Sequence, residues 1–156
     1  MRTIFEPINV KKGVLQSSLM KPNLKEKDED DPRICSNKLS VTRFLYVGIE
    51  FCRRHARSHS NPGKQRKYWG FAKFKCSDLR QKQVIDGETF GCEVLAKPVS
   101  DNWAHANIQM PINEEYRAGV TAPPQFNKYV RHLCKICETI EDPEPDSETW
   151  KGKNVC

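Results

Sequence analysis

Two stretches in the middle of the chain place apolar side chains at alternating positions, the pattern of a β-strand with one covered face. The first spans residues 42–51 and is rich in β-branched and aromatic residues, and the second spans residues 67–75. Apolar runs at residues 90–97 and 104–110, closed by Pro98 and Pro111, predict two further strands. We therefore expect a mainly antiparallel sheet of four to five strands.

The clearest helical pattern lies near the C-terminus, after the helix-starting pair Pro123-Pro124. Apolar residues at helical spacing form one stripe there, comprising Phe126, Tyr129, Val130, Leu133, Cys137 and Ile140. The stripe predicts a helix over 124–140 that packs on one face of the sheet. Shorter helical segments are expected at 78–85 and 113–118. The fold class is α+β, in a single small domain.

The flanks of this domain are more polar. Residues 1–39 are interpreted as an N-terminal arm, able to form one short strand, followed by a charged linker at 21–33. Residues 40–141 form the predicted domain. Residues 142–156 are interpreted as an acidic tail, with Trp150 as its anchor to the domain.

The 156 residues suit one domain with tails, and no apolar run approaches the roughly 18 residues of a membrane span. The first residues lack the apolar region of a secretory signal. We therefore expect a cytoplasmic protein with no membrane partner and with reduced thiols. The odd number of cysteines, seven, also disfavours a complete disulfide framework.

Charge is unevenly distributed along the chain, which carries +6 overall. Residues 40–100 hold 12 basic and 5 acidic side chains, whereas residues 101–156 hold 6 basic and 9 acidic ones. A local basic excess attracts polyanions such as nucleic acid. The same basic residues could instead pair with the acidic tail of this chain.

Residues 67–74, KYWGFAKF, are close to the RNP1 strand of RNA-recognition motifs, and residues 45–48, LYVG, resemble the companion RNP2 strand. That resemblance implies that Trp69, Phe71 and Tyr46 stack on bases and that Lys67 contacts phosphate. The alternative is that a helix covers this face and makes it part of the core.

A basic segment joins the two strands and supplies further candidates for contact with RNA or DNA phosphates. The predicted phosphate-contacting residues are Arg53, Arg54, Arg57, Lys64, Arg66, Lys67 and Lys73.

A cysteine-histidine set has the spacing of two half zinc sites. Cys52-x-x-His55, with His59 four residues later, forms one half, and Cys134-x-x-Cys137, near His132, forms the other. If Cys52, His55, Cys134 and Cys137 converge, they can hold a zinc ion. Alternatively, Cys137 is a small buried apolar residue of the helix. No other cofactor is indicated.

His105, in the predicted strand 104–110, is a candidate general base or anion ligand, with Arg43 as its charged companion. An equally simple interpretation makes His105 a satisfied core or edge residue. Cys52 lies beside basic residues, which favours a lowered thiol pKa.

Residues 42–46, TRFLY, and residues 105–108, HANI, resemble a family of small uncharacterised prokaryotic proteins. Its members have an Arg-Phe-Leu-Tyr opening strand, a middle strand leading to a short leucine-bearing helix, and a closing His-Ala-Asn-Ile strand. The resemblance implies that Arg43 and His105 are site residues and that the protein belongs in a bacterial or phage cytoplasm.

The leading hypothesis is a small basic nucleic-acid-associated binding protein that contacts phosphates through its basic loop. The first alternative is an enzyme, a nuclease or transferase on a phosphate-bearing substrate, that uses His105 and Arg43. The second alternative is a protein-interaction subunit of a toxin-antitoxin or defence complex.

Overall fold

The computed structural model describes the chain except residues 7–8, 13, 23–26, 29–30, 32, 34–35, 61–65, 113–123 and 156. Its helices are η1 (Ser17–Met20, a 3₁₀ helix), α1 (Phe44–Ser58), α2 (Cys76–Arg80) and α4 (Pro124–Ile136). Its strands are β1 (Arg2–Glu6), β2 (Val10–Lys11), β3 (Val14–Leu15), β4 (Lys38–Thr42), β5 (Lys67–Lys73), β6 (Gln83–Ile85), β7 (Glu88–Phe90), β8 (Glu93–Ala96), β9 (His105–Gln109) and β10 (Glu138–Glu141).

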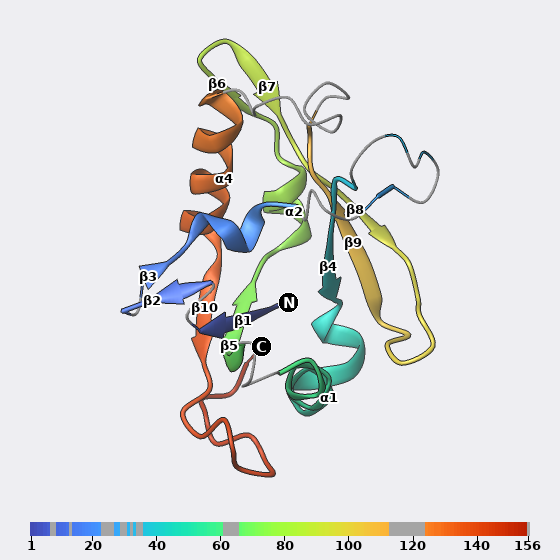
Figure 1. Ribbon diagram of the computed structural model, residues 1–156, viewed down its shortest axis with the longest axis vertical. Coiled ribbons are helices and arrows are strands. Elements are labelled where there is room, and N and C mark those ends of the chain that lie inside the picture. The colour runs from blue at the N-terminus through green and yellow to red at the C-terminus, as the bar shows by residue number, and fades with distance from the viewer. Residues whose placement is uncertain are drawn as a thin grey trace.

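All strand pairs among the described residues are antiparallel, and the α+β class with a C-terminal helix is confirmed. The strands form two three-stranded sheets, β1-β5-β10 and β4-β9-β8, and two hairpins, β2-β3 and β6-β7, rather than one larger sheet. In the view of Figure 1, the sheet β4-β9-β8 lies on one side of β5 and α4 lies on the other. No helix in the described part of the chain is long and apolar enough to cross a membrane.

The main core is formed by residues of α4 and of the strands β1, β4, β5 and β9. α4 contributes Phe126, Tyr129, Val130 and Leu133, as its apolar stripe predicts. The N-terminal arm belongs to the same core through Ile4, and β1 pairs with β5 over its whole length. The arm is therefore packed on the domain, and its strand becomes an edge of a central sheet.

Residues 44–58 form a helix, so the prediction of a strand over 42–51 is wrong. The strand β4 ends at Thr42, and helix α1 follows directly. From Gly48 onward, Ile49, Cys52 and Ala56 recur at helical spacing and pack against one cluster. Gly48 itself has φ 73° and ψ 175°, so it breaks α1 into a first turn and a longer second part.

Strand β5 is confirmed at Lys67–Lys73, but it does not keep a simple alternation of faces. Its pairing with β1 shifts register opposite Ile4 and Phe5, which is a β-bulge. The bulge places Tyr68 and Phe71 on the same side, with ring centroids 5.5 Å apart. Together with Phe5, Cys52 and Ala56 they form a second apolar cluster, here called the α1 cluster.

The C-terminal segment forms a loop after β10 and turns back toward α1 (Figure 1). Arg53 Nε donates to Asp142 Oδ2 at 2.5 Å, and both side chains are buried. Arg57 donates to the carbonyl oxygen of Ser147 at 2.7 Å, and the Trp150 amide donates to Glu50 at 2.7 Å. The basic side chains of α1 thus hold the acidic tail of the same chain.

Candidate functional site

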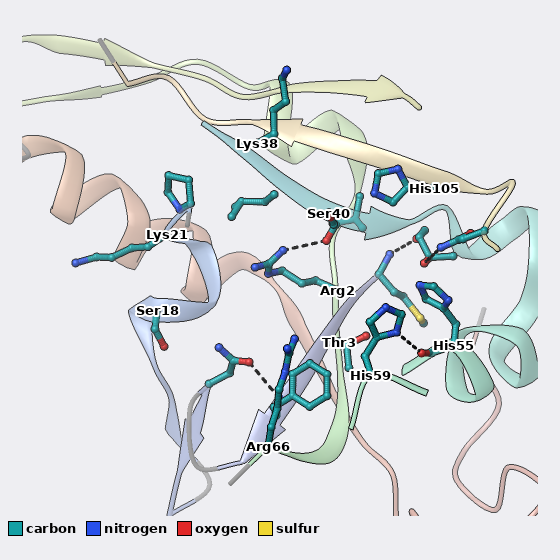
Figure 2. A pocket seen from close by; sticks show the side chains of 18 residues that line it. Arg2, Thr3, Ser18, Lys21, Lys38, Ser40, His55, His59, Arg66 and His105 are labelled. Atoms are coloured by element: carbon teal, nitrogen blue, oxygen red, sulfur yellow. Dashed lines mark hydrogen bonds between the residues drawn. The ribbon is translucent and has the colours of Figure 1, made fainter. Parts of the chain in front are cut away.

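A pocket of about 740 Å³ opens between β1, β4 and the C-terminal end of α1. Its wall includes most of β4, the first residues of β1, His105 of β9, and Arg66 just before β5. The volume lies in the range of small-ligand sites. Segments that are far apart in the sequence therefore meet at one concavity, shown in Figure 2.

The lining is basic. It contains Arg2, Lys21, Lys38 and Arg66 together with three histidines, and none of the described lining residues is acidic. Arg2 donates to the Ser40 carbonyl oxygen at 2.9 Å, which holds its guanidinium across the pocket (Figure 2). The Arg66 guanidinium lies over the Phe5 ring, 4.2 Å from the centroid. An anion is the ligand that such a lining favours.

Two of the pocket histidines lie at the C-terminal end of α1, where His55 is in the last turn and His59 is the residue that caps the helix. His55 and His59 are four residues apart, so they project from the same face, and their ring centroids are 4.6 Å apart. Figure 2 shows the two imidazoles side by side. Burial lowers the pKa of His55, and the neighbouring His59 lowers it further. His55 is therefore held toward its neutral form, in which one ring nitrogen can accept a proton or bind a metal.

The third histidine, His105, was predicted as a site residue and does line the pocket. Its Nδ1 lies 2.6 Å from the carbonyl oxygen of Lys97. A carbonyl oxygen only accepts, so Nδ1 carries the hydrogen and Nε2 is left with the lone pair of the neutral ring. This arrangement suits a proton acceptor or a ligand.

Arg43, the predicted companion of His105, is not among the residues that line this pocket. It precedes α1, and its guanidinium donates to the carbonyl oxygens of Trp103 and Ala104 at 3.3 Å. The same group lies 4.5 Å from the centroid of the Tyr46 ring. Its place in the structure is a link between the start of α1 and the connection between β8 and β9.

Next to the pocket, Tyr46 and Trp103 form an exposed aromatic pair, with ring centroids 6.2 Å apart and planes at 84°. Tyr46 is 60% exposed and Trp103 54%. Asn102 lines the pocket and donates its side-chain amide to the hydroxyl of Thr42, another lining residue, at 2.8 Å. Trp103 follows Asn102 directly in the chain. Asn102 is buried, and its Oδ1 accepts no hydrogen bond from the described residues.

The structure places two of the predicted phosphate-contacting residues, Arg53 and Arg57, against the C-terminal segment. Arg53 is 1% exposed and paired with Asp142, so it cannot reach a phosphate. Arg57 is engaged with the Ser147 carbonyl. Their alternative role, pairing with the acidic tail, is the observed one. Arg54 is exposed on the same helix, and Lys64 lies outside the described residues.

The aromatic residues of β5 do not form the exposed stacking face that the sequence predicts. Phe71 is 1% exposed within the α1 cluster, because the bulge turns it toward α1. Trp69 is partly buried and packs against the main core. Lys73 forms an ion pair with Glu138 of β10, 3.3 Å away. Lys67 is exposed, but of the two aromatic residues predicted beside it on β5, Phe71 is buried and Trp69 is partly buried.

The predicted zinc quartet does not assemble. Cys52 lies in the α1 cluster, whereas Cys134 and Cys137 lie on or just after α4 and pack against the main core. In the described part of the chain, the group of three or more potential ligands that comes together is His55, His59 and Asp101. The five described cysteines are free thiols. Burial raises the pKa of Cys52 to about 11, contrary to the expected lowering.

Sequence reasoning missed the pocket residues Arg2 and Lys38 and the neighbouring Trp103. Arg2 and Lys38 were assigned to an arm outside the domain, although both lie in strands. Lone basic residues at strand positions give no local signal. The spacing of His55 and His59 is a usable signal once residues 49–58 are read as a helix.

No protein-family model, no curated protein and no solved structure matches the chain significantly.

Proposed function

We propose that this protein is a nucleic-acid-binding protein whose basic pocket holds a phosphate-bearing segment of a single strand. The observation that carries the proposal is the pocket lining of four arginine or lysine residues and three histidines. None of the described lining residues is acidic, and carboxylates close to them belong to Asp28, 3.7 Å from Lys38, and to Asp101, 3.9 Å from His55. The pocket thus replaces the basic loop as the proposed phosphate site.

The exposed pair of Tyr46 and Trp103 supplies the second half of the proposal. Bases stack on exposed aromatic rings, with a contribution of about 1–3 kcal/mol per base. Because the pair adjoins the Thr42–Asn102 wall, one strand can place a phosphate in the pocket and a base on the aromatic rings. A pocket of nucleotide dimensions also favours a single strand over a duplex.

The test is the fluorescence anisotropy of short labelled single-stranded RNA and DNA at increasing salt concentrations. Each neutralised phosphate of a single strand contributes about −0.7 to the slope of log K against log salt concentration. With about three phosphates neutralised, we expect a slope of roughly −2. Arg66→Ala should reduce the magnitude of the slope by about 0.7. Arg54→Ala removes an exposed arginine of α1 that does not line the pocket, and it should leave the slope unchanged. Binding that does not depend on salt, or no binding, would contradict the proposal.

A second candidate, an enzyme acting on a phosphate-bearing substrate, is favoured by the three histidines. The fixed tautomer of His105 leaves Nε2 able to accept a proton in the pocket. Cleavage of a labelled oligonucleotide that is abolished in His105→Ala, with binding retained, would support this candidate. Binding of the oligonucleotide without any cleavage would contradict the enzyme candidate and agree with the binding function.

A further inference from the structure

The last turn of α1 and the connection between β8 and β9 bring together a second chemical feature at the pocket wall. One ring nitrogen each of His55 and His59 and one carboxylate oxygen of Asp101 all lie within 4.8 Å of one another. Two imidazoles and a carboxylate are ligands that zinc and similar first-row metals accept. The three residues come from two separate segments, so their meeting is a property of the fold.

The hydrogen bonds around His59 prepare it as a ligand. Its Nδ1 lies 2.8 Å from the carbonyl oxygen of His55, which can only accept. Nδ1 therefore carries the hydrogen, and Nε2 presents its lone pair. The Ser58 hydroxyl donates to the same carbonyl oxygen at 2.7 Å and packs beside the ring. An imidazole held by its second nitrogen on a backbone carbonyl is the usual outer shell of a metal-binding histidine.

The positions of His55 and Asp101 need only small adjustments. Asp101 Oδ2 lies 3.9 Å from His55 Nδ1. Ligands of a tetrahedral zinc ion are about 3.3–3.5 Å apart, given metal–ligand distances of about 2.0–2.1 Å. The Asp101 side chain is exposed, so it is free to rotate toward the two rings.

We propose that His55, His59 and Asp101 bind a divalent transition-metal ion of the zinc type at the wall of the basic pocket. Three protein ligands leave a coordination position open, as in zinc sites that bind water or a substrate oxygen. The open position would face the pocket, into which His55 and His59 both project. The proposed site therefore differs from the predicted cysteine-containing zinc site, because none of its ligands is a sulfur atom.

The chain offers a matched control, because it has four histidines and three line the pocket. The fourth, His132, lies on α4 and is not a lining residue. His59 and Asp101 are exposed, so His59→Ala and Asp101→Asn should retain the fold, which a thermal melt verifies.

The experiment is a calorimetric titration of the full chain, stripped with a chelator, with Zn²⁺ alone and then with Co²⁺, in the absence of nucleic acid. We expect one ion per chain, with affinity weakened at least about 10-fold in His59→Ala and in Asp101→Asn, since even outer-shell partners contribute that much. His132→Ala should bind as the wild type does. The Co²⁺ complex should lack sulfur-to-metal charge-transfer absorption.

Absence of binding, unchanged affinity in His59→Ala and Asp101→Asn, or a sulfur charge-transfer band would overturn the proposal. A measurement on the wild-type chain guards against misfolded variants: paramagnetic Co²⁺ should broaden the ring signals of His55 and His59 and leave those of His132 sharp. Because no oligonucleotide is present, failure of the metal site is distinguishable from failure of nucleic-acid binding.

Discussion

Arg53 and Arg54 are neighbours in the sequence with opposite environments. Arg53 is buried and paired with Asp142, whereas Arg54 is exposed to solvent. The sequence shows both as members of one basic run. Burial of an arginine depends on the carboxylate that meets it, and this carboxylate lies 89 residues away in the chain. Local pattern therefore could not separate the structural arginine from the solvated one.

The pair gives a direct prediction for stability. Arg53→Met leaves the Asp142 carboxylate buried without its partner, which should lower the free energy of unfolding by about 3–5 kcal/mol. Arg54→Met, the matched control, should change it by no more than about 0.5 kcal/mol. Urea unfolding followed by circular dichroism measures both. Equal values for the two variants would contradict the assigned ion pair, and Arg53→Met with Asp142→Leu should recover much of the loss.

The thiols give a prediction with a defined pH dependence. Burial raises the pKa of Cys52, Cys92 and Cys134 to about 11. The thiolate is the reactive form, so a raised pKa leaves only about one part in a thousand of each thiol reactive at pH 8. At that pH, alkylation mapped by mass spectrometry should modify the exposed Cys76 first among the five cysteines that the structure describes. The buried thiols should gain reactivity only as the pH approaches 11. Modification of Cys52 as fast as Cys76 at pH 8 would refute this ordering.

At the scale of elements, the strands β5 and β9 and the helix α4 could be predicted from their periodicity. Helix α1 could not, because residues 44–49 form a continuous apolar run with several β-branched and aromatic residues, which is equally typical of a buried strand. The helical spacing begins only after Gly48, where the chain has a positive φ. The bulge in β5 was equally hidden, because it depends on pairing with β1. That single bulge moved Phe71 from the predicted binding face into the core.

Gly70 carries the element-scale prediction. A Cβ at this position would collide with the backbone carbonyl oxygen of Ile140, so β10 approaches β5 closely there. Gly70→Ala should lower the free energy of unfolding by about 1–3 kcal/mol, because neither backbone can move without breaking the sheet. At Gly91 the nearest atom to an added Cβ is a flexible lysine carbon at 3.5 Å. Gly91→Ala is therefore the control, with a change of about 0.5 kcal/mol or less. Equal losses in thermal or urea unfolding would contradict the close approach.

At the scale of the molecule, the pocket is assembled from β1, β4, α1 and β9. Its basic residues are separated by more than a hundred positions, from Arg2 to His105, and each is unremarkable in its own segment. The basic character of residues 40–100 pointed to an anionic partner, but part of that charge holds the tail through Arg53 and Arg57. The basic character of the candidate site could be predicted from the sequence. Most of its residues could not, and the exceptions are His55, His105, Arg66 and Tyr46.

The aromatic pair gives a prediction for the assembled site. Tyr46→Ala should weaken binding of a single-stranded oligonucleotide by about 1–3 kcal/mol, because a stacking surface is lost. The slope of affinity against salt should stay the same, since no phosphate contact changes. Tyr46→Phe keeps the ring and should bind as the wild type does. Fluorescence anisotropy measures the affinity of the wild type and of both variants. Equal weakening by the two substitutions would argue against stacking at Tyr46.

The most direct test of the proposed pocket uses the four histidines as reporters. The ring resonances of the metal-free full chain are recorded by NMR while a short single-stranded oligonucleotide is added. If the phosphate-bearing strand enters the pocket, the signals of His55, His59 and His105 shift together with saturation, and those of His132 on α4 stay in place. Saturable binding that leaves the three pocket histidines unmoved, or that shifts His132 alone, would contradict the account.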